Sequence, residues 1–174
     1  MAALLTRLFA KKWQPLLNKK RNDLAKPLKN SGGDYIHPGV YLLAYSSKTL
    51  SGQRVNPRDV LYVGMTNSAG GLRSRLSQFQ KCLEGGKPHG PGVRFYKKCL
   101  GCRRYSRLRK RKRFFFVALA VPCESDKSEA EPCDFVEMGK VASLEYEAIA
   151  RVLRSTGWLP PLNDLSKDAL DHVS

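Results

Sequence analysis

Residues 39–46 read GVYLLAYS, and residues 59–66 read DVLYVGMT. Both runs are rich in Val, Leu and Tyr, and the interval SKTLSGQRVNPRD between them is polar. Apolar runs on either side of a polar interval are typical of two strands joined by a long hairpin loop, here over 39–46 and 60–64. If these strands pair, Tyr41 and Tyr62 can lie on the same face near the middle of the hairpin.

Two helices and a third strand are predicted downstream of the hairpin. Apolar residues recur at helical spacing over 72–84 and 138–154, and residues 114–121, FFFVALAV, form an apolar strand-like run. The order strand, strand, helix, strand, helix predicts a small α/β domain over 35–165, with a three-stranded, partly antiparallel sheet flanked by helices. We expect the acidic residues 122–137 to form a surface loop.

Two flanking segments and one internal loop complete the predicted organisation. Residues 1–34 are predicted to be a basic helical extension and linker, because a leucine stripe recurs there at helical spacing and prolines limit each helix. Residues 166–174 are expected to be a flexible tail. Glycine and proline predict a loop over 85–92, around His89.

The charge balance is the strongest feature of the composition. The 174 residues include 31 Lys and Arg against 15 Asp and Glu, a formal net charge of +16. Such an excess favours a polyanionic partner, nucleic acid first and an anionic membrane surface second. No uncharged apolar run reaches the length of about 18 residues that a membrane span needs.

Cysteine usage and the N-terminal composition bear on the compartment. Five cysteines without a secretory signal pattern indicate free thiols in a reducing environment. A mitochondrial presequence is less favoured, because the N-terminus is rich in Lys and poor in Ser. We therefore expect a cytoplasmic protein, with the nucleoid or nucleus as alternatives.

Each predicted helix carries one charge on the side that should face the sheet. Arg75 lies three residues after Leu72 and four before Phe79, and Glu145 lies four residues after Val141. Unpaired buried charge is costly, so these two residues need partners. One interpretation is an internal Arg75–Glu145 ion pair.

The tyrosines support a second interpretation of the same charges. Two phenols, an arginine and a carboxylate on one sheet face suit phosphodiester hydrolysis, with a metal on the carboxylate, the arginine on phosphate and a phenol near the attacking water. Helical spacing turns Glu145 toward the sheet, whereas Glu147 lies on the solvent side of the same helix.

Five segments of the chain, in order, resemble the GIY-YIG endonuclease family. Gly39-Val40-Tyr41 is similar to the first half of the name motif, and Tyr62-Val63-Gly64 is similar to the second. The segments GLRSRLSQF, LEYEAIARVL and WLPPLND resemble those that follow, and they carry Arg75, Glu145 and Asn163 respectively. The resemblance spans residues 37–165.

The resemblance implies a fold, an activity and a role for each matching residue. It implies a small α/β domain with a central three-stranded antiparallel sheet that cuts DNA with one divalent metal, Mg²⁺ or Mn²⁺, held by Glu145. Tyr62 would be the general base assisted by Tyr41, Arg75 would bind the scissile phosphate, and Asn163 would support the site. A phenol has an ordinary pKa of about 10, so a base role needs nearby positive charge.

Two lengths depart from the family pattern. The hairpin loop between the two name motifs is longer than typical, and the spacing from Glu145 to Asn163 is longer than usual. Glu147 therefore remains the alternative to Glu145 as the metal ligand.

A third departure concerns the residue four positions after the arginine. Several members carry His or Tyr four residues after the arginine, where this chain has Phe79. His89 could replace that group, or it could be a surface histidine without a catalytic role. A non-cleaving nucleic-acid-binding module on the same fold, or a basic ribonucleoprotein component, therefore remains an alternative. Specificity would come from loops 46–59 and 85–113, from a homodimer or from a targeting partner.

The segment RFYKKCLGCRRYSRLRKRKR, residues 94–113, is predicted to be a basic insertion. Aromatic residues mixed with dense positive charge suit contacts to a nucleic-acid backbone, and the alternative is a solvated charge run or localisation signal. The candidate DNA contacts are Arg103, Arg104, Arg107, Arg109, Lys110, Arg111, Lys112 and Arg113.

The basic segment also contains a pair of cysteines at zinc-knuckle spacing. Cys99 and Cys102 are separated by two residues, and Cys123, Cys133 or His89 could complete four ligands. The second pair is not closely spaced, so a structural Zn²⁺ is the less favoured expectation.

Overall fold

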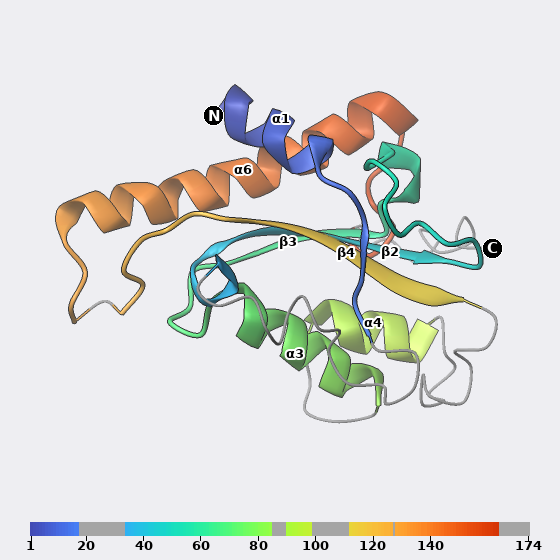
Figure 1. Ribbon diagram of the computed structural model, residues 1–174, viewed down its shortest axis with the longest axis horizontal. Helices are drawn as coiled ribbons and strands as arrows, with labels where there is room; N and C mark the ends of the chain where they lie inside the picture. Colours follow the sequence, from blue (N-terminus) through green and yellow to red (C-terminus); the bar gives the residue numbers. More distant parts are fainter. Residues whose placement is uncertain (18–33, 85–89, 99–111, 127, 164–174) are drawn as a thin grey trace.

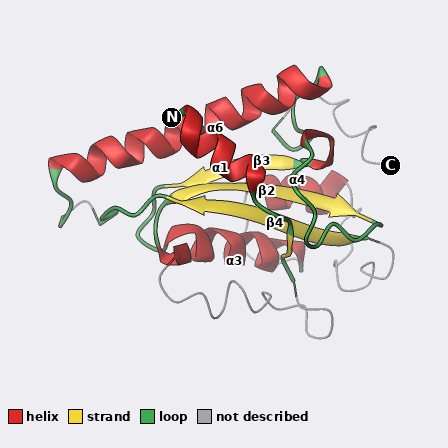
Figure 2. Ribbon diagram, turned by 45° about the horizontal axis from the view of Figure 1, so that its top comes forward, coloured by secondary structure: helices red, strands yellow, loops and turns green. Residues whose placement is uncertain are grey.

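The computed structural model describes residues 1–17, 34–84, 90–98, 112–126 and 128–163 (Figure 1). In chain order the elements are α1 (Ala2–Ala10), β1 (Gln14–Pro15), η1 (Asp34–Ile36), β2 (Gly39–Ser46), η2 (Pro57–Asp59), β3 (Tyr62–Thr66), α3 (Gly71–Leu83), α4 (Gly90–Lys98), β4 (Arg113–Ala120) and α6 (Pro132–Thr156). The strands form one antiparallel sheet in the order β1-β4-β2-β3. Helices α1 and α6 lie on one face of the sheet, and α3 and α4 lie on the other (Figures 1 and 2).

The α/β class and the antiparallel hairpin are confirmed, but the expected three-stranded sheet is wrong by one strand. The additional strand is β1, whose two residues Gln14 and Pro15 pair with Phe116 and Phe115 of β4. A two-residue strand has no periodic sequence pattern of its own. It forms because β4 offers unpaired backbone groups along its outer edge.

Strand β2 is the centre of the sheet, because it pairs with β3 on one side and β4 on the other. Tyr41 lies between Gly64 of β3 and Ala118 of β4. Both faces of β2 are covered, so side chains of both orientations are buried. Val40 and Leu42 pack toward α6, whereas Tyr41 and Leu43 pack toward α3.

The sheet separates two hydrophobic cores, and both helical faces predicted from spacing are buried in them. On the α3 side the buried helical residues are Leu72, Leu76, Phe79 and Leu83. On the α6 side they are Val141, Leu144, Ala148 and Val152. Burying each large aliphatic or aromatic side chain contributes about 1.5–3 kcal/mol, so both layers are held firmly to the sheet.

Helix α6 begins at Pro132, six residues before the predicted start, so residues 132–137 are helical rather than a loop. Proline is favoured at the first helical position, and Glu131 and Asp134 form a reciprocal capping box. The acidic composition that suggested a loop instead supplies this cap. Figure 1 shows that the early turns of α6 extend beyond the sheet, which explains why they lack an apolar stripe.

Helix α4 was not expected, because its first residues, Gly90 and Pro91, belong to the predicted glycine and proline loop. Its third residue, Gly92, packs so closely on α3 that an added Cβ would meet Cys82. Phe95 is fully buried on the same side of the sheet as α3. The helix therefore exists because of its tertiary contacts, which local propensity does not report.

The first 17 residues are packed into the domain. Leu8 and Phe9 of α1 join the core beneath α6, and Arg151 of α6 stacks over the Phe9 ring at 4.4 Å from its centroid. Trp13 is 1% exposed. Residues 1–17 therefore contribute core to the domain predicted for 35–165. No helix in the described part of the chain is long and apolar enough to cross a bilayer.

Candidate functional site

The two tyrosines of the hairpin lie on the same face of the sheet, toward α3. Tyr41 is directly opposite Gly64, and Tyr62 is directly opposite Leu43, so the two phenols are diagonal neighbours. Their ring centroids are 5.9 Å apart, with an interplanar angle of 55°. This close arrangement is what the hairpin pattern predicted.

Gly64 provides the space in which the two rings meet. A Cβ added at Gly64 would lie 2.8 Å from both Cζ and Oη of Tyr41 and still closer to the Tyr62 ring. Real Cβ atoms do not approach other atoms this closely, so only glycine allows the phenols to occupy these positions.

Arg75 reaches this pair of phenols from α3. Its Nη1 lies 3.4 Å from Oε1 of Gln78, whereas its buried Nε has no hydrogen-bond partner among the described residues. The buried Tyr41 hydroxyl likewise lacks a partner with good hydrogen-bond geometry within the described ranges, although the Arg75 guanidinium lies close enough to affect its pKa. Polar groups left unsatisfied in this way mark a position where a ligand or water would be stabilised.

Glu145 approaches from α6, on the opposite face of the sheet. It can act on the tyrosines because β3 is an edge strand, so a side chain from α6 can reach the edge and the backbone of Met65. Burial raises the pKa of the Glu145 carboxyl, while the Met65 backbone hydrogen bond and the Arg75 charge oppose that rise. Of the two candidate carboxylates, Glu145 is the one whose charge acts on both tyrosines.

The Arg75–Glu145 ion pair that the sequence left open is not formed. Both residues are described and half-buried, yet no salt bridge joins them. The favourable charge interaction between them therefore acts over a longer distance. A small anion or a cation can thus interact with one of these groups without first breaking a direct contact.

Asn163 connects the C-terminal segment to the edge of the sheet. Its Oδ1 accepts a hydrogen bond from the Val63 N–H at 2.8 Å, and its Nδ2 donates one to the Val63 carbonyl at 2.7 Å. Beside it, the Leu162 N–H donates to the carbonyl of Leu61 at 3.0 Å. Asn163 therefore supports the strand that carries Tyr62 and does not point a free amide at the phenols.

Both phenols are neutral at physiological pH in the free protein. Burial raises the pKa of Tyr41 above its ordinary value, Tyr62 raises it further, and Arg75 opposes the rise. Burial and the Glu145 charge also raise the pKa of Tyr62, whereas Arg75, Arg94 and the Tyr41 hydroxyl lower it. Deprotonating either phenol near neutral pH would need positive charge beyond that of the described residues.

Phe79, at the position where the resemblance led us to look for a polar residue, is a core residue. It is fully buried, and its ring packs edge-on against Phe114 with centroids 5.3 Å apart. A hydroxyl or imidazole at this position would be buried in an aromatic cluster. His89, the proposed replacement, lies outside the described residues.

The remaining predicted residues fall mostly outside the described ranges. This holds for the six cations of the basic segment, Arg103, Arg104, Arg107, Arg109, Lys110 and Arg111, and for Cys99 and Cys102. Lys112 lies over the Tyr45 ring at 5.8 Å from its centroid, and Arg113 is exposed. Cys123 and Cys133 are free thiols.

Sequence reasoning missed Arg94 as an individual site residue. It lies on α4, its Nη2 donates to the Leu162 carbonyl at 2.7 Å, and its charge lowers the pKa of Tyr62. In the sequence it is merely the first cation of a basic segment. Only the packing of α4 distinguishes it from its neighbours.

A divalent cation fits the carboxylate at this site. Mg²⁺ is commonly bound through one or two carboxylates, with substrate phosphate and water as its other ligands. Within the described ranges no group of three His, Cys, Asp or Glu side chains gathers, so Glu145 would be the protein ligand. A bound cation would offset the burial that raises the pKa of this carboxyl.

In comparisons with known proteins, no family model, curated protein or solved structure matches the chain. A function must therefore be inferred from the residues that gather around β3. Two buried phenols, an arginine with an unsatisfied donor and a desolvated carboxylate form a polar group on an otherwise apolar sheet.

Proposed function

We propose that the chain is a metal-dependent endonuclease of the GIY-YIG type, which hydrolyses DNA phosphodiester bonds. The observation that supports this best is the convergence of four side chains, contributed by two strands and by helices on opposite faces of the sheet. The four are Tyr41, Tyr62, Arg75 and Glu145. A hydrophobic core does not need this combination, because a carboxylate, a guanidinium and two hydroxyl groups are costly to bury without partners.

Each residue has a role that its surroundings favour. Arg75 retains a donor for a phosphate oxygen, since its Nε–H has no partner among the described residues. Tyr62 holds the attacking water by a hydrogen bond at its Oη, and Tyr41 fixes the Tyr62 ring. Glu145 holds the metal.

The raised pKa of Tyr62 sets a condition for its acting as a base. The phenol is neutral in the free protein, so it can take the proton of water only when added positive charge lowers its pKa. A divalent cation on Glu145 supplies such charge, lowers the pKa of water and neutralises charge on phosphate. The net positive charge of +16 favours binding of a polyanion such as DNA.

Nicking of supercoiled plasmid in the presence of Mg²⁺ tests this proposal. Glu145→Gln removes the carboxylate charge but keeps the shape, and we expect nicking to fall by about a hundredfold or more. Glu147→Gln removes the same charge two residues later on the same helix and is expected to nick like the unmodified protein.

Two of the following results would contradict the proposal, and the second of the three would change only its metal ligand. Equal nicking by Glu145→Gln and the unmodified protein would indicate a contaminating nuclease. Loss of nicking in Glu147→Gln alone would assign the metal to the other carboxylate. DNA binding without any Mg²⁺- or Mn²⁺-dependent nicking would favour the non-cleaving nucleic-acid-binding module.

A further inference from the structure

Two arginines on different helices act on the same phenol. The charges of Arg75, on α3, and Arg94, on α4, both lower the pKa of Tyr62. In each guanidinium the Nε is buried without a hydrogen-bond partner among the described residues. A buried unsatisfied donor costs about 1–3 kcal/mol, so each of the two Nε–H groups favours a compensating acceptor.

Two contacts determine the position of Arg94: the packing of its neighbour Phe95 and a hydrogen bond from its own side chain. Phe95, the next residue along α4, is fully buried and packs against the rings of Tyr45 and Phe114, with centroids 4.9 Å and 4.8 Å away. The Nη2 of Arg94 is held by the Leu162 carbonyl at 2.7 Å. One edge of the guanidinium is therefore occupied, and the rest of the fork is held in place.

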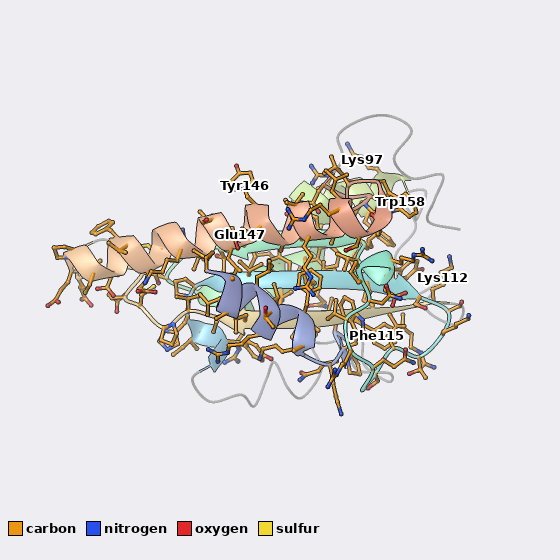
Figure 3. All side chains as sticks on the ribbon, turned by 90° about the horizontal axis from the view of Figure 1, so that it is seen from above. Lys97, Lys112, Phe115, Tyr146, Glu147 and Trp158 are labelled. Atoms are coloured by element: carbon orange, nitrogen blue, oxygen red, sulfur yellow. The ribbon has the colours of Figure 1, made fainter. Side chains whose placement is uncertain are left out.

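This anchoring brings Arg94 to the residues around Tyr62. Leu162, whose carbonyl accepts from Arg94, donates its own N–H to the carbonyl of Leu61. Leu61 immediately precedes Tyr62 in the chain. Lys97, one turn along α4, is by contrast exposed and projects outward (Figure 3). Position within the helix, rather than charge alone, therefore separates Arg94 from the other cations.

We propose that Arg94 is a second phosphate-binding residue, which together with Arg75 holds one phosphate group of the nucleic acid beside Tyr62. This inference rests on the proposed function, because it identifies the ligand of the same site. Arginine is suited to the role, since its planar fork donates two parallel hydrogen bonds to phosphate oxygens.

Two arginines rather than one match the change in charge during hydrolysis. A phosphodiester carries one negative charge, whereas the terminal phosphate left after the P–O bond breaks carries about −1.5 to −2 at pH 7. Water would add its oxygen to phosphorus and pass one proton to the Oη of Tyr62, ionised only when a bound cation lowers its pKa. The P–O bond to the leaving oxygen would break, and that oxygen would take a proton from solvent. A second guanidinium at this phosphate would stabilise the charge that develops during the step.

Titration of the full-length protein with inorganic phosphate tests the inference without requiring catalysis. The arginine Nε–H resonances of ¹⁵N-labelled protein would be followed by NMR, against chloride at matched ionic strength. We expect two of them to move with the same phosphate dependence. Arg75→Lys and Arg94→Lys each remove one of these resonances and thereby assign them.

Affinity for phosphate provides the second measurement. Arg94→Lys keeps the positive charge but removes the planar guanidinium and its paired hydrogen bonds, so we expect its Kd for phosphate to rise about tenfold. Lys97→Gln removes a positive charge from the same helix and should change the Kd less than twofold. If a variant at this position folds poorly, the Nε–H resonance of Arg94 can be assigned in the unmodified protein through its bonds to the backbone, so its response to phosphate can still be measured.

The outcomes separate this inference from the proposed function. An Arg94 resonance that does not move while that of Arg75 does, or an Arg94→Lys variant with unchanged phosphate affinity, would overturn the inference. Phosphate-dependent shifts at both arginines without nicking by the protein would leave it standing and overturn the endonuclease proposal. Nicking by the protein without a phosphate-dependent shift of the Arg94 resonance would support the endonuclease proposal and overturn this inference.

Discussion

At the scale of single residues, the candidate site depends on a glycine, Gly64, because a side chain at this position would occupy the space of the two phenols. Gly64 is directly opposite Tyr41 in the hairpin and lies beneath both phenol rings. Any larger residue must push the rings away from each other or from the sheet, and the fully packed core on that side leaves them little space to move.

Gly64→Ala is therefore expected to lower stability by about 1–3 kcal/mol, the usual cost of overpacking a core, and to abolish nicking. Thermal unfolding and the plasmid assay measure the two effects. The control is Gly139→Ala on α6, where an added Cβ meets nothing within 4 Å, so stability should rise by about 0.5–1 kcal/mol. Unchanged stability in Gly64→Ala would show that the phenols are not packed as described.

At the scale of elements, β3 is the one that organises the site. It is an edge strand, and its outward-facing backbone groups would be open to pairing with another chain. Both outward groups of Val63 are bonded to Asn163, and the Met65 backbone lies close enough to the Glu145 carboxylate to lower its pKa. The residues proposed for the site thus also close the sheet edge, which couples the stability of the strand to the geometry around Tyr62.

Removing the amide at position 163 tests this coupling. Asn163→Ala leaves both backbone groups of Val63 without their partner, and we expect a loss of about 1–3 kcal/mol and faster hydrogen exchange at the Val63 amide. Asn67→Ala is the matched control, since the side chain of Asn67 makes a single hydrogen bond to the described residues, from Nδ2 to the Met138 carbonyl at 3.1 Å. Val63 exchange that is equal in the two variants would refute the coupling.

Helices α3, α4 and α6 show which helices a sequence pattern predicts and which it does not. The face of α3 was predicted correctly because Leu72, Leu76 and Phe79 keep strict helical spacing. Helix α4 was missed because it begins with glycine and proline and depends on its contacts with α3. The early turns of α6 were missed because they extend past the sheet and need no apolar stripe.

At the scale of the whole molecule, the first 17 residues complete the structure. Figure 2 shows α1 on the α6 side of the sheet, and β1 pairs with the edge of β4. Segments far away in the sequence thus cover both edge strands of the central hairpin and β4: β1 pairs with β4, and Asn163, after α6, bonds to β3. The domain is a single packing unit across these segments.

The two tryptophans of the chain test this view of the N-terminus. Trp13 is 1% exposed and Trp158 is 49% exposed. Trp13→Ala is expected to cost about 3–5 kcal/mol in stability, against less than about 1 kcal/mol for Trp158→Ala. Urea denaturation measures both, and a small effect at Trp13 would show that residues 1–17 do not support the fold.

Part of the candidate site could be predicted from the sequence, and the rest became evident only in the structure. Spacing alone placed Tyr41 and Tyr62 on one face and favoured Glu145 over Glu147, because periods of 2 and 3.6 determine facing locally. It did not reveal Arg94, the role of Gly64 as a space for the rings, or the absence of an Arg75–Glu145 ion pair. Each of these depends on distances between elements far apart in the chain.

By itself, the sequence determined the α/β class, the central hairpin, the buried faces of α3 and α6 and the basic character of the protein. These follow from alternation, helical period and composition, which are local properties. Only the tertiary structure decided that β1 extends the sheet, that α4 forms, and that Asn163 closes the edge of β3. The reason is physical: a short strand, a glycine-rich helix and a side chain bonded to a distant backbone are stabilised by contacts that no local pattern encodes.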